Sequence, residues 1–210
     1  MIPLPMFLMM LQPEAALQIE PRPDASERKS SVADEVRRAH ALGPAPDPVC
    51  CPHCPDHKPA AGCHRDCAAA PRRLSSEDER SPVEPRVAPL VFELKKLGVF
   101  HPCWSCEGHA DAAGNVWKIP RVWFYSDSVV HVRALAEALD RLYAARRLAG
   151  RWQLVLTHSD AANPDTTFSL EPEPAADQSL SKLQADLRVI ADELGRQFWL
   201  VCDALTPPAR

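Results

Sequence analysis

Residues 121–157 decide the fold, and they read RVWFYSDSVVHVRALAEALDRLYAARRLAGRWQLVLT. The stretches at its two ends, RVWFYS (121–126) and WQLVLT (152–157), are bulky apolar runs of strand length. Between them, residues 128–149 carry apolar side chains at helical spacing: Val132, Leu135, Leu139 and Leu142. A strand, a helix and a second strand in this order form a βαβ unit, so we expect the two strands to be parallel.

Further elements flank this unit. VWKI (116–119) has the composition of a short strand ahead of Pro120, and TTFSL (166–170) that of a return strand antiparallel to WQLVLT. Apolar residues at helical spacing predict two more helices, over residues 87–97 and 179–204. We therefore expect an α/β (α+β) fold, in which a small mixed β-sheet contains the βαβ unit and helices pack mainly on one face.

Aromatic residues and prolines are unevenly distributed along the chain. One of the 13 aromatic residues lies before residue 90, whereas 15 of the 22 prolines do. A core needs large apolar side chains, and the early part of the chain has few of them. We predict a flexible, disordered Pro-rich arm over residues 1–86, with a short helix at 31–42. A compact α/β domain over 87–205 and a tail over 206–210 complete the chain.

Composition excludes some classes of function. The formal net charge is -4 and the pI is about 6.1, so no large basic surface for nucleic acid is expected. The sequence contains no run of 18 apolar residues, so no membrane span is predicted. The apolar stretch at residues 1–11 lacks the leading basic residue of a signal peptide, so a cytoplasmic location is predicted. In a reducing compartment, the eight cysteines would be free thiols or metal ligands.

The first group of potential metal ligands lies in the arm, where residues 50–67 read CCPHCPDHKPAAGCHRDC. Two close pairs of cysteines can supply the four thiolates of a tetrahedral zinc site: Cys51 with Cys54, and Cys63 with Cys67. The gap between the pairs is shorter than in common zinc fingers, and aromatic residues are missing around it. A Cys-rich tail with adventitious metal affinity is therefore the alternative interpretation.

The second group lies in the domain, where residues 101–111 read HPCWSCEGHAD. A C-x-x-C turn can present Cys103 and Cys106 to one zinc ion, with His109 as the third ligand. His101, His158 and Cys202 are the candidates for the fourth. Gly108 would let the backbone fold back to present His109. Two alternatives remain open, namely a hairpin whose cysteines are small core residues, and a redox-active dithiol formed by Cys103 and Cys106.

Polar residues follow both strands of the expected βαβ unit. Asp127 comes directly after the first strand, and His158 and Asp160 follow the second. Ligands of α/β sheets tend to bind at the carboxyl ends of strands, so these three side chains are candidates for a hydrolytic metal or acid/base centre. The same residues are also what a helix N-cap and an ordinary loop require.

The leading hypothesis is a cytoplasmic, metal-binding accessory or interaction protein with zinc as its cofactor. Its arm would engage another protein, and neither nucleic acid nor membrane would be a partner. The alternatives are a small metal-dependent hydrolase built at Asp127 and His158, and a thiol redox protein that uses Cys103 and Cys106. The sequence contains no P-loop, nucleophile elbow or H-E-x-x-H motif, so an enzyme is the less favoured class.

Overall fold

The structure is a computed structural model. It describes these parts of the chain: residues 25–42, 62–75, 80–126, 128–158, 166–175 and 179–206. The side chains of residues 25–30 and of His158 lie outside the description. Within the described ranges, no helix combines the length and the apolar character needed to cross a membrane.

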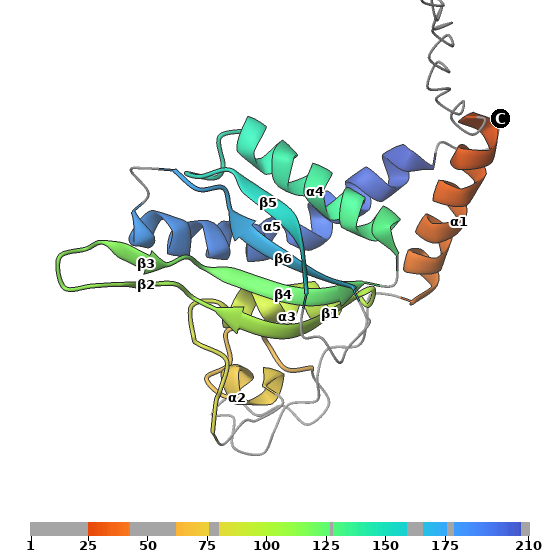
Figure 1. Cartoon of the computed structure of the whole chain (residues 1–210). Helices are drawn as coiled ribbons and strands as arrows, with labels where there is room; N and C mark the ends of the chain where they lie inside the picture. Colours follow the sequence, from red (N-terminus) through yellow and green to blue (C-terminus); the bar gives the residue numbers. More distant parts are fainter. Residues whose placement is uncertain are drawn as a thin grey trace, which may run out of the picture.

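Four strands form the main sheet, in the order β1-β4-β6-β5. The strands are β1 (Phe100–Cys106), β4 (Arg121–Ser126), β6 (Thr166–Pro172) and β5 (Trp152–His158). Every neighbouring pair is antiparallel. Two short strands, β2 (His109–Ala110) and β3 (Val116–Lys118), pair separately and prolong the β1–β4 hairpin beyond the sheet, as Figure 1 shows.

The predicted α+β fold is confirmed, and so is the antiparallel pairing of residues 166–170 with 152–157. The mixed sheet is not found, because β6 lies between β4 and β5 and separates them. Both of these strands run antiparallel to β6, so they share a direction without being paired. The hairpin of β5 and β6 explains this order, since it places Phe168 and Leu170 opposite Phe124 and Val122 on the buried face.

Three helices cover that buried face: α3 (Ala88–Lys96), α4 (Val129–Ala144) and α5 (Leu180–Leu205). Helix α4 begins where Ser128 caps it, because the Ser128 hydroxyl accepts a hydrogen bond of 3.1 Å from the N–H of Val130. Its apolar stripe packs on β5 and on α5, and α3 packs on α5 and β1. Figure 1 shows α3 and α5 behind the sheet, in agreement with the prediction of helices mainly on one face.

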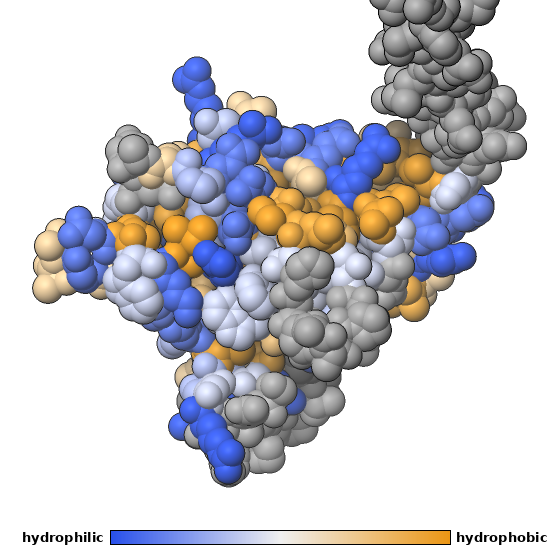
Figure 2. All heavy atoms as spheres, in the orientation of Figure 1, coloured by the Kyte–Doolittle hydropathy of each residue, from blue (hydrophilic) through white to orange (hydrophobic). Residues whose placement is uncertain are grey.

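The other face of the sheet has no helix on it in the described part of the chain. Trp104 and Trp123 lie opposite each other on β1 and β4, with ring centroids 5.1 Å apart. Apolar side chains gather over β5 and α4 in Figure 2. On these two elements, Leu156 and Val129 are 63% and 72% exposed. The sheet is therefore covered by helices on one side only.

Part of the N-terminal arm contacts the domain. Helix α1 (Ala25–Leu42) places Val36 and Ala39 against α4 and α5, where both residues are buried. His40 of α1 stacks on Trp199 with ring centroids 4.5 Å apart. Further along, α2 (Ala70–Leu74) packs on α3. The packed body thus includes residues before 87, because these segments find their partners on helices far away in sequence.

We expect a buried charge to release α1 from the body. Val36→Asp would place a carboxylate in an apolar contact without a partner, at a cost of about 2–3 kcal/mol. Hydrogen exchange should then show loss of protection over residues 31–42, while the centre of α4 stays protected. Asp34→Ala, at an exposed position of the same helix, is the control. Unchanged protection in Val36→Asp would contradict the packing of α1.

Candidate metal site

Three side chains with metal-ligand chemistry converge at the end of β1. The carboxylate of Glu84, the thiol of Cys106 and the imidazole of His109 each offer one ligand atom, and these atoms all lie within 4.8 Å of one another. Cys106 ends β1, His109 begins β2, and Glu84 precedes α3. The chain therefore brings together two neighbouring residues of a hairpin and one residue from a separate segment.

A glycine makes the close approach of Cys106 and His109 feasible. Gly108 has a φ of +83°, in the region that favours glycine. A Cβ atom at this position would lie 2.7 Å from Cδ1 of Leu180 and 2.9 Å from the nitrogen of Pro120. The chain therefore turns between β1 and β2 at the one residue type that fits there. The expectation that Gly108 lets the backbone fold back agrees with this conformation.

Backbone hydrogen bonds hold Glu84 in place. The N–H of Glu107 donates to Oε2 of Glu84 at 2.7 Å, and the N–H of Arg86 donates to Oε2 of Glu107 at 2.9 Å. The second carboxylate oxygen of Glu84, Oε1, lies 3.0 Å from Nε2 of His109. One oxygen of Glu84 is thus occupied by the backbone, while the other faces the imidazole and is available to an ion shared with it.

The environment of Cys106 combines burial with a hydrogen bond. The side chain is 2% exposed, and this burial raises the pKa of the thiol. The N–H of Gly108, 3.4 Å from Sγ, acts in the opposite direction because it favours the thiolate. A cation bound beside Sγ would favour the thiolate further, since the thiolate is the form that ligates metal.

The ligand types and their spacing suit a tetrahedral ion. Zinc takes Cys sulfur, His nitrogen and Glu oxygen at about 2.0–2.3 Å, so neighbouring ligand atoms of a tetrahedron lie roughly 3.3–3.8 Å apart. The ligand atoms all lie within 4.8 Å of one another, and Oε1 of Glu84 lies 3.0 Å from Nε2 of His109. These distances are close to the range that a tetrahedral ion requires. His109 is also fixed from its ring face, because it stacks on Trp117 with centroids 5.2 Å apart. Small side-chain adjustments would therefore complete the coordination.

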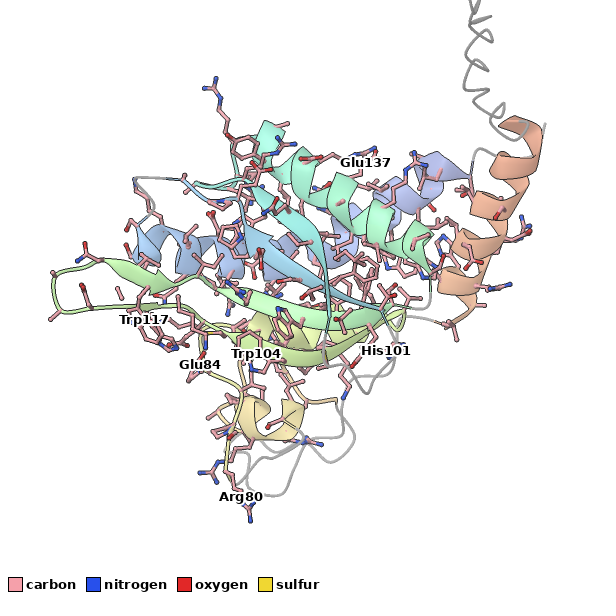
Figure 3. All side chains as sticks on the ribbon, viewed as in Figure 1. Arg80, Glu84, His101, Trp104, Trp117 and Glu137 are labelled. Carbon is pink, nitrogen blue, oxygen red and sulfur yellow. The ribbon has the colours of Figure 1, made fainter. Side chains whose placement is uncertain are left out.

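A cavity of about 740 Å³ adjoins this group. Glu84 and Cys106 line it, together with Trp104 and Lys118. The Lys118 ammonium lies 4.9 Å from the centroid of the Trp104 ring, in a cation–π contact. Figure 3 shows Glu84 below the hairpin, close to Trp104 and Trp117. Two of the three potential ligands, Glu84 and Cys106, thus lie at the wall of a hollow and not inside a closed core.

Two of the residues predicted to join this site lie outside the converged group. Cys103 is exposed and lines the same cavity as Cys106, but its sulfur is not part of the group. His101 pairs with Tyr125 near the start of β1, and Figure 3 places it at the other end of the strand from Glu84. The structure therefore brings Cys106 and His109 together, with Glu84 in place of the other candidates.

The surroundings of Cys103 and Cys106 do not activate either thiol. Burial raises the pKa of the Cys106 thiol, and desolvation likewise raises the pKa of Cys103. Reactive thiols have a lowered pKa, often at a helix N-terminus, whereas both of these cysteines lie in strand β1. The thiol redox hypothesis thus gains no support from the geometry.

The remaining sequence-predicted residues fall mainly outside the described part of the chain. In the first cluster, Cys63 is buried and Cys67 half-buried, while Cys51 and Cys54 lie outside the described residues. The same holds for Asp127, for Asp160 and for the side chain of His158. The described backbone shows that β4 and β5 both end at the same edge of the sheet, as expected for the strands that precede these residues.

Glu84 was missed by the sequence analysis. It lies in the sequence SPVEPRV, which has the composition of a linker, and 22 residues separate it from Cys106. No spacing rule connects such a residue to a C-x-x-C motif. The one available signal was its position just ahead of Pro85 and the helix that follows, where the chain must turn back toward the domain.

No family model matches the sequence, and no curated protein or solved structure is significantly similar to it. The class of site must therefore be assigned from its own residues. They form a Glu/Cys/His group that could hold a metal ion, on an α+β protein.

Proposed function

We propose that this chain is a zinc-binding protein, with Glu84, Cys106 and His109 as ligands. The observation that carries the proposal is the convergence of three different ligand types, all within 4.8 Å of one another, from a hairpin and a separate segment of the chain. A carboxylate, a thiol and an imidazole have little other reason to share one place beside a cavity. A hydrogen-bonded Glu84–His109 pair would by itself not need a buried sulfur next to it.

The mixture of ligand atoms favours zinc over other common ions. Calcium and magnesium take oxygen ligands, so a site with one carboxylate, one sulfur and one nitrogen suits neither. Zinc accepts all three ligand types and has no geometric demand that the site would fail. Copper and nickel also bind such ligands, and the metal analysis below distinguishes them from zinc.

The role we assign to the ion is structural support of an interaction protein. Zinc at this place would tie the segment before α3 to the end of β1 and to β2. The arm would engage another protein, an assignment supported by the high proline content of the first part of the chain. The protein would then be an accessory factor whose metal centre holds its hairpin in one position.

Metal analysis of untagged protein tests the proposal. The wild type should carry zinc, and Cys106→Ser, His109→Ala and Glu84→Gln should each reduce the content by about one ion per chain, since each removes a ligand. His40→Ala, at a histidine 48% accessible through its side chain and outside both groups of candidate ligands, is the matched control and should lose no zinc. The difference between wild type and Cys106→Ser also separates this site from any ion held by the cysteines of the arm.

Equal zinc content in the wild type and in Cys106→Ser would contradict the proposal. So would a wild-type protein that contains no zinc and takes up none when it is added under reducing conditions. In that case Glu84 and His109 form an ordinary ion pair beside a buried core cysteine, as the hairpin alternative expects.

A further inference from the structure

We propose that the zinc centre keeps one coordination position open toward the adjoining cavity, where it binds the carboxylate of a small organic acid with an apolar body. Lys118 would make the second contact to that carboxylate. The inference rests on the proposed zinc site and adds to it a ligand class and a residue that recognises the ligand.

The first argument is the number of ligands. Within the described residues, the converged group supplies three ligand atoms, from Glu84, Cys106 and His109. Zinc is almost always four-coordinate, and three protein ligands with a fourth exchangeable position is the arrangement of sites that bind small molecules. Two of the three ligands, Glu84 and Cys106, line the cavity, and His109 is not among its lining residues. The remaining position of an ion held between them would face the hollow.

The second argument is charge. A zinc ion with one carboxylate and one thiolate is formally neutral, so the ion does not repel an anion. Lys118 then supplies a positive charge at the same cavity, and its ammonium is held 4.9 Å from the Trp104 ring centroid. It makes no ion pair with a carboxylate in the described part of the chain. A metal ion and an ammonium on the wall of one hollow are the partners that a carboxylate prefers.

The third argument is the remainder of the cavity wall. Beyond the polar end, the lining includes large apolar side chains from several elements: Leu74, Val83, Val91, Pro102 and Trp104. The volume of about 740 Å³ exceeds what a carboxylate alone requires. An anionic head with an apolar body fits both halves, whereas a phosphate or a sugar would leave the apolar half without a partner.

Cobalt(II) replaces zinc and makes the coordination visible as absorption bands, so the full-length protein loaded with cobalt provides the test. Acetate, butyrate and hexanoate are the probes. We expect hexanoate to shift the cobalt bands with an affinity of about millimolar, and to bind more tightly than acetate by about two- to fourfold per CH₂ that enters the cavity. Lys118→Gln should weaken hexanoate binding about tenfold without loss of cobalt, because one charged contact is removed. Lys182→Gln, at an exposed position of α5, should leave it unchanged.

Three results would overturn the inference, and they differ from a failure of the metal site itself. Cobalt that binds with bands insensitive to hexanoate up to about 100 mM, far above millimolar affinity, would show that no open position exists. A loss of sulfur-to-cobalt absorption in Cys103→Ser would show that Cys103 fills that position as a second thiolate. An equal response to all three acids, unaffected by Lys118→Gln, would show adventitious anion binding at the ion. In each of these cases the cobalt content would still be present and the zinc proposal would stand, whereas absence of cobalt would remove both.

Discussion

Removal of zinc from the full-length protein is expected to lower its melting temperature by roughly 8–16 °C. A ligand present at about a thousandfold its dissociation constant stabilises the folded state by about 4 kcal/mol. For a chain of 150–250 residues, each kcal/mol corresponds to about 2–4 °C. The measurement is a thermal melt with and without a chelator, under reducing conditions, with zinc content determined on the same samples.

The physical reason is that the ligands come from segments that the metal-free protein holds together weakly. Glu84 is attached to the hairpin through one hydrogen bond from the backbone N–H of Glu107, and it shares with His109 a contact that is partly exposed on both sides. Contacts of this kind contribute little in water. An ion that bridges them contributes its binding free energy to folding, because the unfolded chain does not preserve the site.

Two variants make this result specific. Cys106→Ser should melt at the temperature of the metal-free wild type and should not respond to the chelator, because the ion has lost one of its ligands. Cys103→Ser has the same number of cysteines as Cys106→Ser and is the matched control. Because Cys103 lies outside the converged group, the melting temperature of this variant should still fall when the chelator is added. A wild type that melts identically with and without chelator, while its zinc content falls to zero, would exclude a stabilising role for this site.

The elements of the domain were largely predictable because each has a local signal. Helix α4 could be located from its apolar stripe alone, and β5 and β6 from bulky runs separated by turn residues. Strand β1 could not, since HPCWSC contains a proline and two cysteines and has no alternating pattern. Its identity as a strand comes from pairing with β4, where Phe100 is buried and Trp104 meets Trp123.

The sheet order depended on contacts that sequence does not record. The βαβ pattern of β4, α4 and β5 correctly predicts two strands with the same direction. It says nothing about a third strand that enters between them. That third strand is β6, and it fits there because Leu170 and Phe168 continue the buried row of β4, while on β5 they lie opposite Leu154 and Leu156.

The candidate site was predictable only in part. The C-x-x-C motif and His109 directed attention to the correct hairpin, and Gly108 to the turn that presents the histidine. The expected compact turn is instead an extended strand, in which successive residues advance about 3.3 Å, so His101 lies roughly 17 Å from Cys106. The third member of the group, Glu84, reaches the site through tertiary packing of a segment with no secondary structure.

A second large effect is expected at Asp186, a carboxylate 3% exposed beneath the turn between α4 and β5. Its oxygens accept three hydrogen bonds: from Ala149 N–H at 2.8 Å, from Gly150 N–H at 2.9 Å and from the Trp152 indole N–H at 3.1 Å. Trp152 is 2% exposed, so no solvent can replace the carboxylate at its indole N–H, whereas Ala149 and Gly150 lie nearer the surface. The side chain therefore fixes the start of β5 and the edge of the sheet.

We expect Asp186→Ala to destabilise the protein by about 2–4 kcal/mol, roughly 4–16 °C in melting temperature, because it leaves the buried indole N–H of Trp152 and two part-buried backbone N–H groups without their acceptor. Asp186→Asn should cost less, since its one oxygen can still serve the two donors that meet Oδ2, while its amide faces Ala149 N–H. Asp140→Ala is the matched control: this exposed carboxylate pairs with Arg151, and its loss should cost less than about 1 kcal/mol.

A double-mutant cycle with Trp152→Phe separates the hydrogen bonds from the packing. Phenylalanine at position 152 lacks the indole donor. In the Trp152→Phe background, Asp186→Ala therefore leaves two donors without an acceptor instead of three. The double variant should lose about 1 kcal/mol less free energy of unfolding than the sum of the two single variants. Urea unfolding of the four proteins measures this coupling, provided that their dependence on urea is the same. Strict additivity, or an Asp186→Ala variant as stable as Asp140→Ala, would mean that the carboxylate does not support the turn, and the start of β5 would then be held by the packing of Trp152 alone.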